Sequence, residues 1–168
     1  MLKNLQVDEA KVSEIAERVG KLLVQKGWTL ATAESCTGGL IGHCVTNISG
    51  SSEFYLGSVI SYANAVKEQL LGIPPTLLKE QGAVNHQVAL GMAKGVRELL
   101  HTDVGIGVTG IAGPTGGTPE KPVGTVFIAI STPEGEEAHH YVWSKDRVGN
   151  KYLSAQAALT LLEDRLRR

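Results

Sequence analysis

The chain has 168 residues, of which 42% are apolar and 20% are charged, and this composition is typical of one soluble domain covering residues 1–168. With a net charge of −1, the chain has no excess of positive charge to attract the phosphate backbone of a nucleic acid, so nucleic acid is excluded as the main ligand. The N-terminal segment Met1–Leu5 has no leader pattern and no apolar run could span a bilayer, so we expect a cytoplasmic protein without a membrane partner.

The expected helices and strands alternate along the chain. Apolar side chains recur at helical spacing from Asp8 to Lys26, where Asp8 can cap the start and Gly27 can end the helix. Further helices are predicted over 38–46, 64–72 capped by Asn64, 87–100 capped by Asn85, and 148–167, with a short turn starting at Pro74–Pro75. Strands are predicted over 28–33, 57–62 and 104–109, followed by a hairpin of 124–132 and 136–143 across Pro133–Gly135.

The order of these elements predicts the fold class. Helices connect the first three strands, which makes those strands parallel, and the hairpin adds an antiparallel pair. We therefore expect an α/β protein, a three-layer α/β/α sandwich around a mixed, mostly parallel sheet of five strands. Gly105 and Gly107 lie in a strand with the composition of one buried on both faces, where glycine allows another backbone to approach closely.

Three polar segments each begin where a predicted strand ends. They are residues 33–39 (AESCTGG), 61–67 (SYANAVK) and 108–117 (VTGIAGPTGG). Ligands of open α/β sheets bind outside the carboxyl ends of the strands, where one crevice collects residues distant in sequence. The segments therefore predict one shared site with a hydroxyl, a phenol, an amine and many backbone N–H groups.

Ser35 is the candidate nucleophile of this site. It stands at a strand-to-helix turn, and the following amides, at Thr37, Gly38 and Gly39, can offer N–H groups to an anion or an oxyanion. The alternative is a serine that only caps the next helix.

Lys67 and Tyr62 are candidates to activate that hydroxyl. A lysine whose pKa is lowered by burial and by a helix N-terminus can take the proton of a serine, and Tyr62 could relay the proton or orient the pair. A solvated lysine and an aromatic side chain that covers the core are the alternatives.

Cys36 is a second possible nucleophile beside Ser35. No histidine lies in the flanking motif to generate a thiolate, so we favour a small buried thiol. The pair His139–His140 falls in the predicted hairpin, where neighbouring side chains point to opposite faces and cannot hold one metal ion. We therefore expect no metal site.

The segment Thr109–Gly117 contains four glycines and a proline, and its amides could bind a phosphate or a carboxylate. The candidate contacts are Gly110, Gly113 and Gly116, with Lys121 and Arg147 as the nearest cations. It fits neither a Walker loop nor a dinucleotide fingerprint, so a small anion is favoured over ATP. A plain connecting loop is the alternative, although its length argues for function.

These motifs together resemble a known family. Ala33–Gly39, Gly57–Tyr62 with Lys67, and Thr109–Pro114 with Lys121–Thr125 are similar to the CinA C-terminal domain family, the nicotinamide-nucleotide amidohydrolases. The resemblance runs from about residue 8 to the last helix, and it also implies a CinA-like, anticodon-binding-domain-like α/β/α sandwich.

The resemblance implies hydrolysis of nicotinamide mononucleotide to nicotinate mononucleotide and ammonia, in pyridine nucleotide recycling, without a metal or organic cofactor. It implies Ser35 as nucleophile, Lys67 as general base, Tyr62 as supporting phenol, Thr109 as a hydroxyl beside the oxyanion or substrate, and Arg147 near the substrate. A homo-oligomer is also expected. The rival hypothesis is a nucleotide-binding or regulatory module that keeps the fold and performs no turnover.

Overall fold

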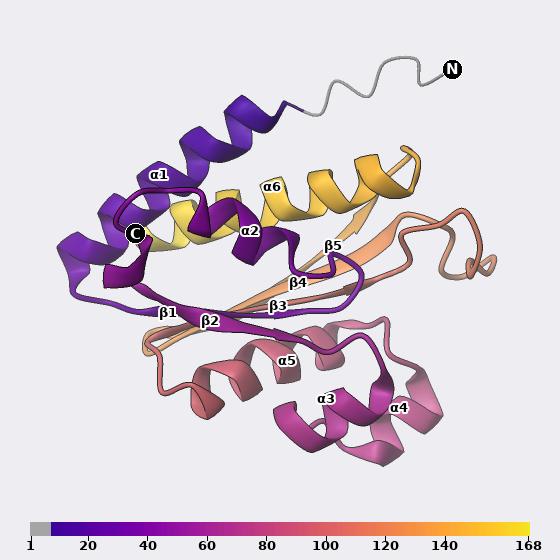
Figure 1. Ribbon diagram of the computed structural model, residues 1–168. Coiled ribbons are helices and arrows are strands. Elements are labelled where there is room, and N and C mark those ends of the chain that lie inside the picture. The colour runs from indigo at the N-terminus through magenta and orange to yellow at the C-terminus, as the bar shows by residue number, and fades with distance from the viewer. Residues whose placement is uncertain (1–7) are drawn as a thin grey trace.

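A computed structural model of the protein describes residues 8–168 and has the predicted three-layer architecture (Figure 1). The segment Met1–Leu5, in which we found no leader pattern, lies outside the described residues. The helices are α1 (Glu9–Lys26), α2 (Leu40–Thr46), α3 (Asn64–Leu71), α4 (Pro75–Gln81), α5 (His86–Leu99) and α6 (Arg147–Leu166), with a 3-10 turn η1 (Ser51–Glu53). The strands are β1 (Leu30–Glu34), β2 (Tyr55–Ile60), β3 (Val104–Gly110), β4 (Thr125–Thr132) and β5 (Gly135–Val142).

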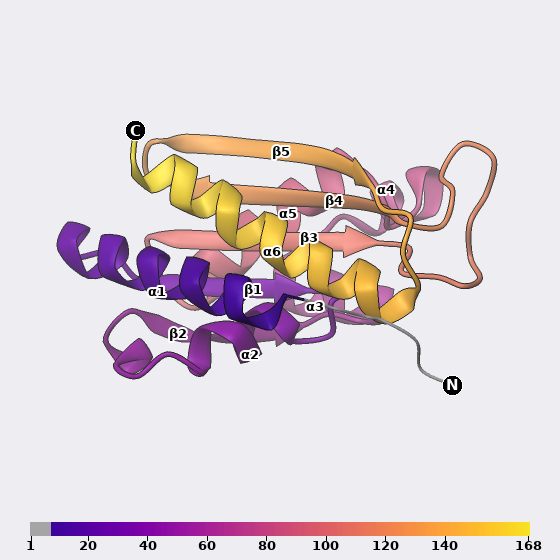
Figure 2. The same ribbon diagram turned by 90° about the horizontal axis from the view of Figure 1, so that it is seen from above.

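The five strands form one mixed sheet in the order β2-β1-β3-β4-β5. β1 pairs in parallel with β2 and β3, whereas β4 is antiparallel to both β3 and β5. Helices α1, α2 and α6 cover one face, and α3, α4 and α5 cover the other (Figure 1). Figure 2 shows the loop between β3 and β4 extending beyond the end of the sheet, on the side where β1 and β3 end.

Local sequence signals account for both ends of α1 and for the start of α5. Asp8 caps α1 by accepting a hydrogen bond from the Lys11 amide, and Gly27 ends this helix in the left-handed conformation, both as predicted. Asn85 caps α5 in the same way, through the Val88 amide.

β3 and α5 lie in close contact, as the glycines in the strand predicted. A Cβ atom at Gly105 or Gly107 would overlap the carbonyl oxygens of Ala93 and Ala89 in α5. The two glycines therefore bring the backbone of α5 against the centre of the sheet.

Several predicted boundaries differ from the structure by one or two residues, and three of the differences have an identifiable cause. β1 begins at Leu30 rather than Trp28, because the Trp28 amide donates to the Leu23 carbonyl and completes the end of α1. β2 covers Tyr55–Ile60 rather than 57–62, since its register is set by pairing with β1. Ala63 is the N-cap of α3, so Asn64 is the first helical residue and makes no capping bond.

None of the helices among residues 8–168 combines the length and the hydropathy needed to cross a membrane.

Candidate active site

A pocket of about 300 Å³ lies at the carboxyl ends of β1 and β3. Its walls come from the segment after β1, the start of α3, the residues between α4 and α5, the loop after β3 and the first residue of α6. The lining residues are Ser35, Cys36, Tyr62, Asn64, Lys67, Ala83, Val84, Thr109, Gly110, Ile111, Ala112, Gly113, Thr115, Gly116 and Arg147. The tertiary structure thus brings residues of all three predicted segments to one cavity.

Ser35 and Lys67 are in direct contact inside this pocket. The Lys67 Nζ atom lies 3.0 Å from the Ser35 Oγ atom, and it also donates to the Ser61 carbonyl oxygen at 2.6 Å. The exposed fraction is 1% for Lys67 and 8% for Ser35. A buried amine therefore faces a hydroxyl that retains access to the pocket.

The surroundings of Lys67 destabilise its charged form. Burial lowers the pKa of the Lys67 ammonium group, and the thiol of Cys36 opposes this effect only in part. Within residues 8–168, neither hydrogen-bond partner of its Nζ atom is a carboxylate. An uncharged lysine beside a serine hydroxyl can accept the hydroxyl proton.

The turn after Ser35 uses some of its amides internally. The Gly38 amide donates to the Ser35 carbonyl oxygen, and the Gly39 amide donates to a carboxylate oxygen of Glu34. Thr37, Gly38 and Gly39 all lie outside the pocket lining. The anion contacts expected at these three positions are therefore not part of this pocket, and the amides of Gly38 and Gly39 are engaged in fixing the turn.

Thr109 lines the pocket, but its hydroxyl has another partner. Its Oγ1 atom donates to the Ala83 carbonyl oxygen at 2.7 Å. Because a hydroxyl carries a single proton, donation from Thr109 to an oxyanion would require this bond to break. The bond holds the end of β3 against the segment after α4.

Tyr62 and Arg147 meet at the exposed rim. The Arg147 Nη2 atom donates to the Tyr62 hydroxyl at 2.9 Å, and its Nη1 atom donates to the Gly113 carbonyl oxygen at 2.6 Å. Tyr62 is 62% exposed, and among residues 8–168 its hydroxyl has no bond to Ser35 or Lys67. The structure thus joins Tyr62 to the cation of α6 rather than to the Ser–Lys pair.

The glycine-rich loop is held through its carbonyl groups. Asn150 donates to the Ala112 carbonyl oxygen, as Arg147 does to that of Gly113. In the described part of the chain, the amides of Ala112, Gly113, Thr115 and Gly116 have no hydrogen-bond acceptor. These lining amides therefore remain available to an anionic ligand.

The other candidates from the sequence have different surroundings. Lys121 lies outside the pocket lining, and its ammonium group donates to the Gln81 carbonyl oxygen. Cys36 lines the pocket, but burial raises the pKa of its thiol to about 12. At neutral pH it is therefore a protonated thiol, as the sequence indicated.

Three residues in or beside the pocket were not predicted from the sequence as site residues. Asn64, for which the sequence predicts a capping role, lines the pocket, and the Ser61 carbonyl oxygen accepts a hydrogen bond from the Lys67 Nζ atom. Asn150 holds the glycine-rich loop from α6, only one turn after Arg147. The role of Asn150 has no local pattern, because its partner Ala112 lies in a distant segment of the chain.

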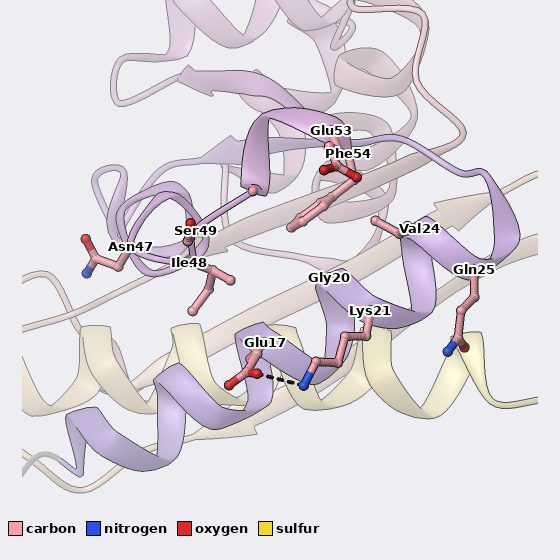
Figure 3. A pocket seen from close by; sticks show the side chains of 11 residues that line it. Glu17, Gly20, Lys21, Val24, Gln25, Asn47, Ile48, Ser49, Glu53 and Phe54 are labelled. Atoms are coloured by element: carbon pink, nitrogen blue, oxygen red, sulfur yellow. Dashed lines mark hydrogen bonds and ion pairs between the residues drawn. The ribbon is translucent and has the colours of Figure 1, made fainter.

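A larger cavity, of about 540 Å³, lies between α1 and the segment around η1 (Figure 3). Its polar side chains include the ion pair of Glu17 and Lys21 at 2.7 Å, and its lining holds no serine paired with a base. Across residues 8–168, no group of three His, Cys, Asp or Glu side chains is arranged to bind a metal ion. The chemistry for nucleophilic attack is thus found at the strand-end pocket.

Comparison with known proteins connects this geometry to a family. The model of the CinA C-terminal domain matches residues 12–166. A CinA-like protein of Salinibacter ruber is 52% identical over 141 residues, which cover 84% of this chain and 34% of that protein. A CinA-like protein of Synechocystis is 49% identical over 155 residues, or 90% of this chain and 37% of the relative. The chain thus spans about a third of the length of these curated relatives.

Solved structures share the whole fold. The crystal structure of a competence/damage inducible protein from Agrobacterium tumefaciens has a TM-score of 0.91 and 36% identity, covering 94% of this chain and 96% of that chain. A competence damage-inducible protein from Klebsiella pneumoniae has a TM-score of 0.90 and 29% identity, with 94% and 98% covered. The α/β/α sandwich expected from the sequence is therefore confirmed.

Proposed function

The chain belongs to the CinA C-terminal domain family, and from this premise we propose that it hydrolyses the carboxamide of nicotinamide mononucleotide. The products are nicotinate mononucleotide and ammonia. The observation that carries the proposal is the 3.0 Å contact between the Nζ atom of buried Lys67 and the Oγ atom of Ser35. A hydroxyl next to an amine with a lowered pKa is suited to attack on an amide carbon.

The reaction proceeds in two stages. Neutral Lys67 accepts the Ser35 proton while Oγ attacks the carboxamide carbon, and the resulting ammonium group then protonates the amide nitrogen, so that the C–N bond breaks and ammonia leaves. Water then attacks the nicotinoyl ester and gives up a proton to Lys67, which passes it to the departing Ser35 Oγ atom. Nicotinate mononucleotide is released, and the serine hydroxyl and the neutral lysine are restored. In both stages, Ser35 carries the acyl group and Lys67 transfers the protons.

Two further features support this substrate class. The tetrahedral oxyanion requires N–H donors, and the Cys36 amide is one lining donor with no backbone acceptor in the described residues. The substrate phosphate requires positive charge and free amides, which Arg147 and the Thr115–Gly116 segment of the pocket lining supply. The cationic pyridinium ring itself withdraws electrons from the amide and eases the attack.

The test is direct. Purified protein is incubated with nicotinamide mononucleotide, and both ammonia and nicotinate mononucleotide are quantified, with Ser35→Ala prepared in parallel as the control for contaminating amidases. We expect stoichiometric release of both products by the wild type only. Parallel assays with free nicotinamide and with the nucleoside that lacks the phosphate should give a lower kcat/KM.

The assay also separates the rival functions. Binding of the nucleotide without ammonia release would support a regulatory module and reject the enzyme. Turnover of free nicotinamide at an equal kcat/KM would instead point to a general small-amide hydrolase, because the phosphate would then contribute nothing.

A further inference from the structure

Glu34 places a buried carboxylate directly before the proposed nucleophile. It is the last residue of β1, and its exposed fraction is 0%. Successive side chains of a strand point to opposite faces of the sheet. Glu34 accordingly contacts α2, whereas Ser35 contacts Lys67 of α3. These two helices lie on opposite faces of the sheet (Figure 1).

The carboxylate is held by backbone donors from the next segment of chain. Its Oε2 atom accepts from the amides of Gly39 at 3.0 Å and Ile41 at 3.1 Å. Its Oε1 atom accepts from the Gly42 amide at 2.9 Å and from the Thr32 hydroxyl at 3.3 Å. The Glu34 side chain thereby connects β1, which precedes the Ser35 turn, with the start of α2, which follows it.

The Glu34 backbone is linked to the base as well. Its carbonyl oxygen accepts from the Ser61 amide at 2.9 Å, and the Ser61 carbonyl oxygen in turn accepts from Lys67 at 2.6 Å. The Ser35 amide donates to the Val108 carbonyl oxygen at 3.0 Å. Hydrogen bonds therefore connect Glu34 to Ser61, Ser61 to Lys67 and Lys67 to Ser35, and the peptide bond between Ser35 and Glu34 completes a closed ring. The Glu34 carboxylate fixes the turn that contains Ser35.

We propose that Glu34 is a positioning residue for the Ser35 nucleophile, whose carboxylate locks the 35–39 turn so that Oγ faces the Lys67 amine. The proposal rests on the proposed function, since it concerns the rate of the same Ser–Lys step. Glu34 itself does not line the pocket and touches no reacting atom.

The charge of the side chain is what this role requires. Each carboxylate oxygen accepts a hydrogen bond from at least one backbone N–H group. A glutamine has an NH2 group in place of one oxygen, so whichever way its amide is turned, this NH2 group would face a backbone N–H group and lose that hydrogen bond. Water cannot replace the lost acceptor because the site is buried. Glu34→Gln thus perturbs the turn while keeping nearly the same size.

The experiment compares Glu34→Gln with Glu163→Gln. Glu163 is a second buried glutamate with charged partners, but it joins α1 to α6 away from the pocket. At a temperature where urea titration shows both variants folded, Glu34→Gln should lower kcat about 100-fold with KM within about twofold, because a misplaced nucleophile slows chemistry without weakening binding. Glu163→Gln should change stability only. An unchanged kcat for folded Glu34→Gln would overturn the proposal.

A substrate-independent readout separates this proposal from the proposed function. A fluorophosphonate phosphonylates an activated serine with loss of fluoride, and mass spectrometry of the Ser35 peptide gives the rate. If the wild type labels but does not hydrolyse the nucleotide, the substrate assignment fails, and slower labelling of Glu34→Gln still supports positioning. Equal labelling rates would reject it.

A second variant and a second measurement cover the remaining outcomes. Should Glu34→Gln fail to fold, Glu34→Asp keeps the charge with a shorter reach and should retain structure with an intermediate loss of kcat. If Ser35 does not react with the fluorophosphonate, crystal structures of the wild type and of Glu34→Gln are compared. The distance from Ser35 Oγ to Lys67 Nζ should lengthen beyond hydrogen-bond distance in Glu34→Gln. An unchanged contact would contradict the role.

Discussion

Arg147 and Tyr62, from α6 and from the segment after β2, are joined at the mouth of the pocket by a hydrogen bond of 2.9 Å from Nη2 to the phenolic oxygen. The same guanidinium group holds the Gly113 carbonyl oxygen at 2.6 Å. One cation of α6 therefore contacts both the segment after β2 and the glycine-rich loop. Its position at an exposed rim suits recognition of a substrate phosphate.

Removing this cation should weaken binding more than chemistry. Arg147→Ala is expected to raise KM for nicotinamide mononucleotide about tenfold, with a smaller effect on kcat, because charge and loop support are both lost. Steady-state kinetics will measure the two constants. Lys121→Ala is the matched control, since that ammonium group binds Gln81 outside the pocket, and an equal effect of both substitutions would contradict a specific role for Arg147.

Tyr62 offers a separate test of proton relay. Its hydroxyl contacts Arg147 and has no bond to the Ser–Lys pair in the described residues, so Tyr62→Phe should lower kcat by less than about fivefold. KM should rise modestly as Arg147 loses an acceptor. A fall in kcat of two orders of magnitude would instead show that the phenol takes part in proton transfer.

The pH dependence of kcat/KM should report Lys67. Burial lowers the Lys67 pKa below the usual lysine value of about 10.4, and only the neutral amine can accept a proton. Activity should therefore rise as pH increases through this lowered pKa and then level off. Lys67→Arg should abolish both the activity and the rising limb, because a guanidinium group stays charged at every accessible pH.

The Cys36 thiol should be dispensable. With a pKa of about 12 it is protonated at neutral pH, so Cys36→Ala is expected to retain kcat within about threefold and to fold normally. Ammonia release and thermal unfolding will check both points. Loss of activity comparable to that of Ser35→Ala would reassign the nucleophile.

The contact between α1 and α6 should make stability pH-dependent. Hydrogen bonds from Arg18 and Arg167, opposed in part by burial, lower the pKa of Glu163 to about 2. The carboxylate therefore contributes stability above its unfolded pKa of about 4.3, and this contribution is lost as pH falls towards 2.

Urea unfolding of Glu163→Gln and wild type will measure this contribution. At neutral pH the substitution should cost about 1 kcal/mol, a value reduced by solvent screening of the half-exposed guanidinium groups. The difference should shrink as the pH approaches 2. A difference independent of pH would show that packing, rather than charge, is responsible.

Local patterns in the sequence determined the elements and their order. Asp8, Gly27 and Asn85 set helix ends through bonds to amides and carbonyls within a few residues, so spacing alone was sufficient. The same holds for the strand-end placement of Ser35 and the glycine-rich loop, since the carboxyl ends of parallel strands meet at one edge.

Only the tertiary structure decided which of these groups interact. In the folded chain, the Lys67 amine is hydrogen-bonded to Ser35 and the Thr109 hydroxyl to the Ala83 carbonyl oxygen. The Gly38 and Gly39 amides donate to Ser35 and Glu34 within the turn. A hydrogen-bonding group can be recognised in a sequence, but its partner cannot, because the choice among many possible partners depends on strand register and on how distant segments pack.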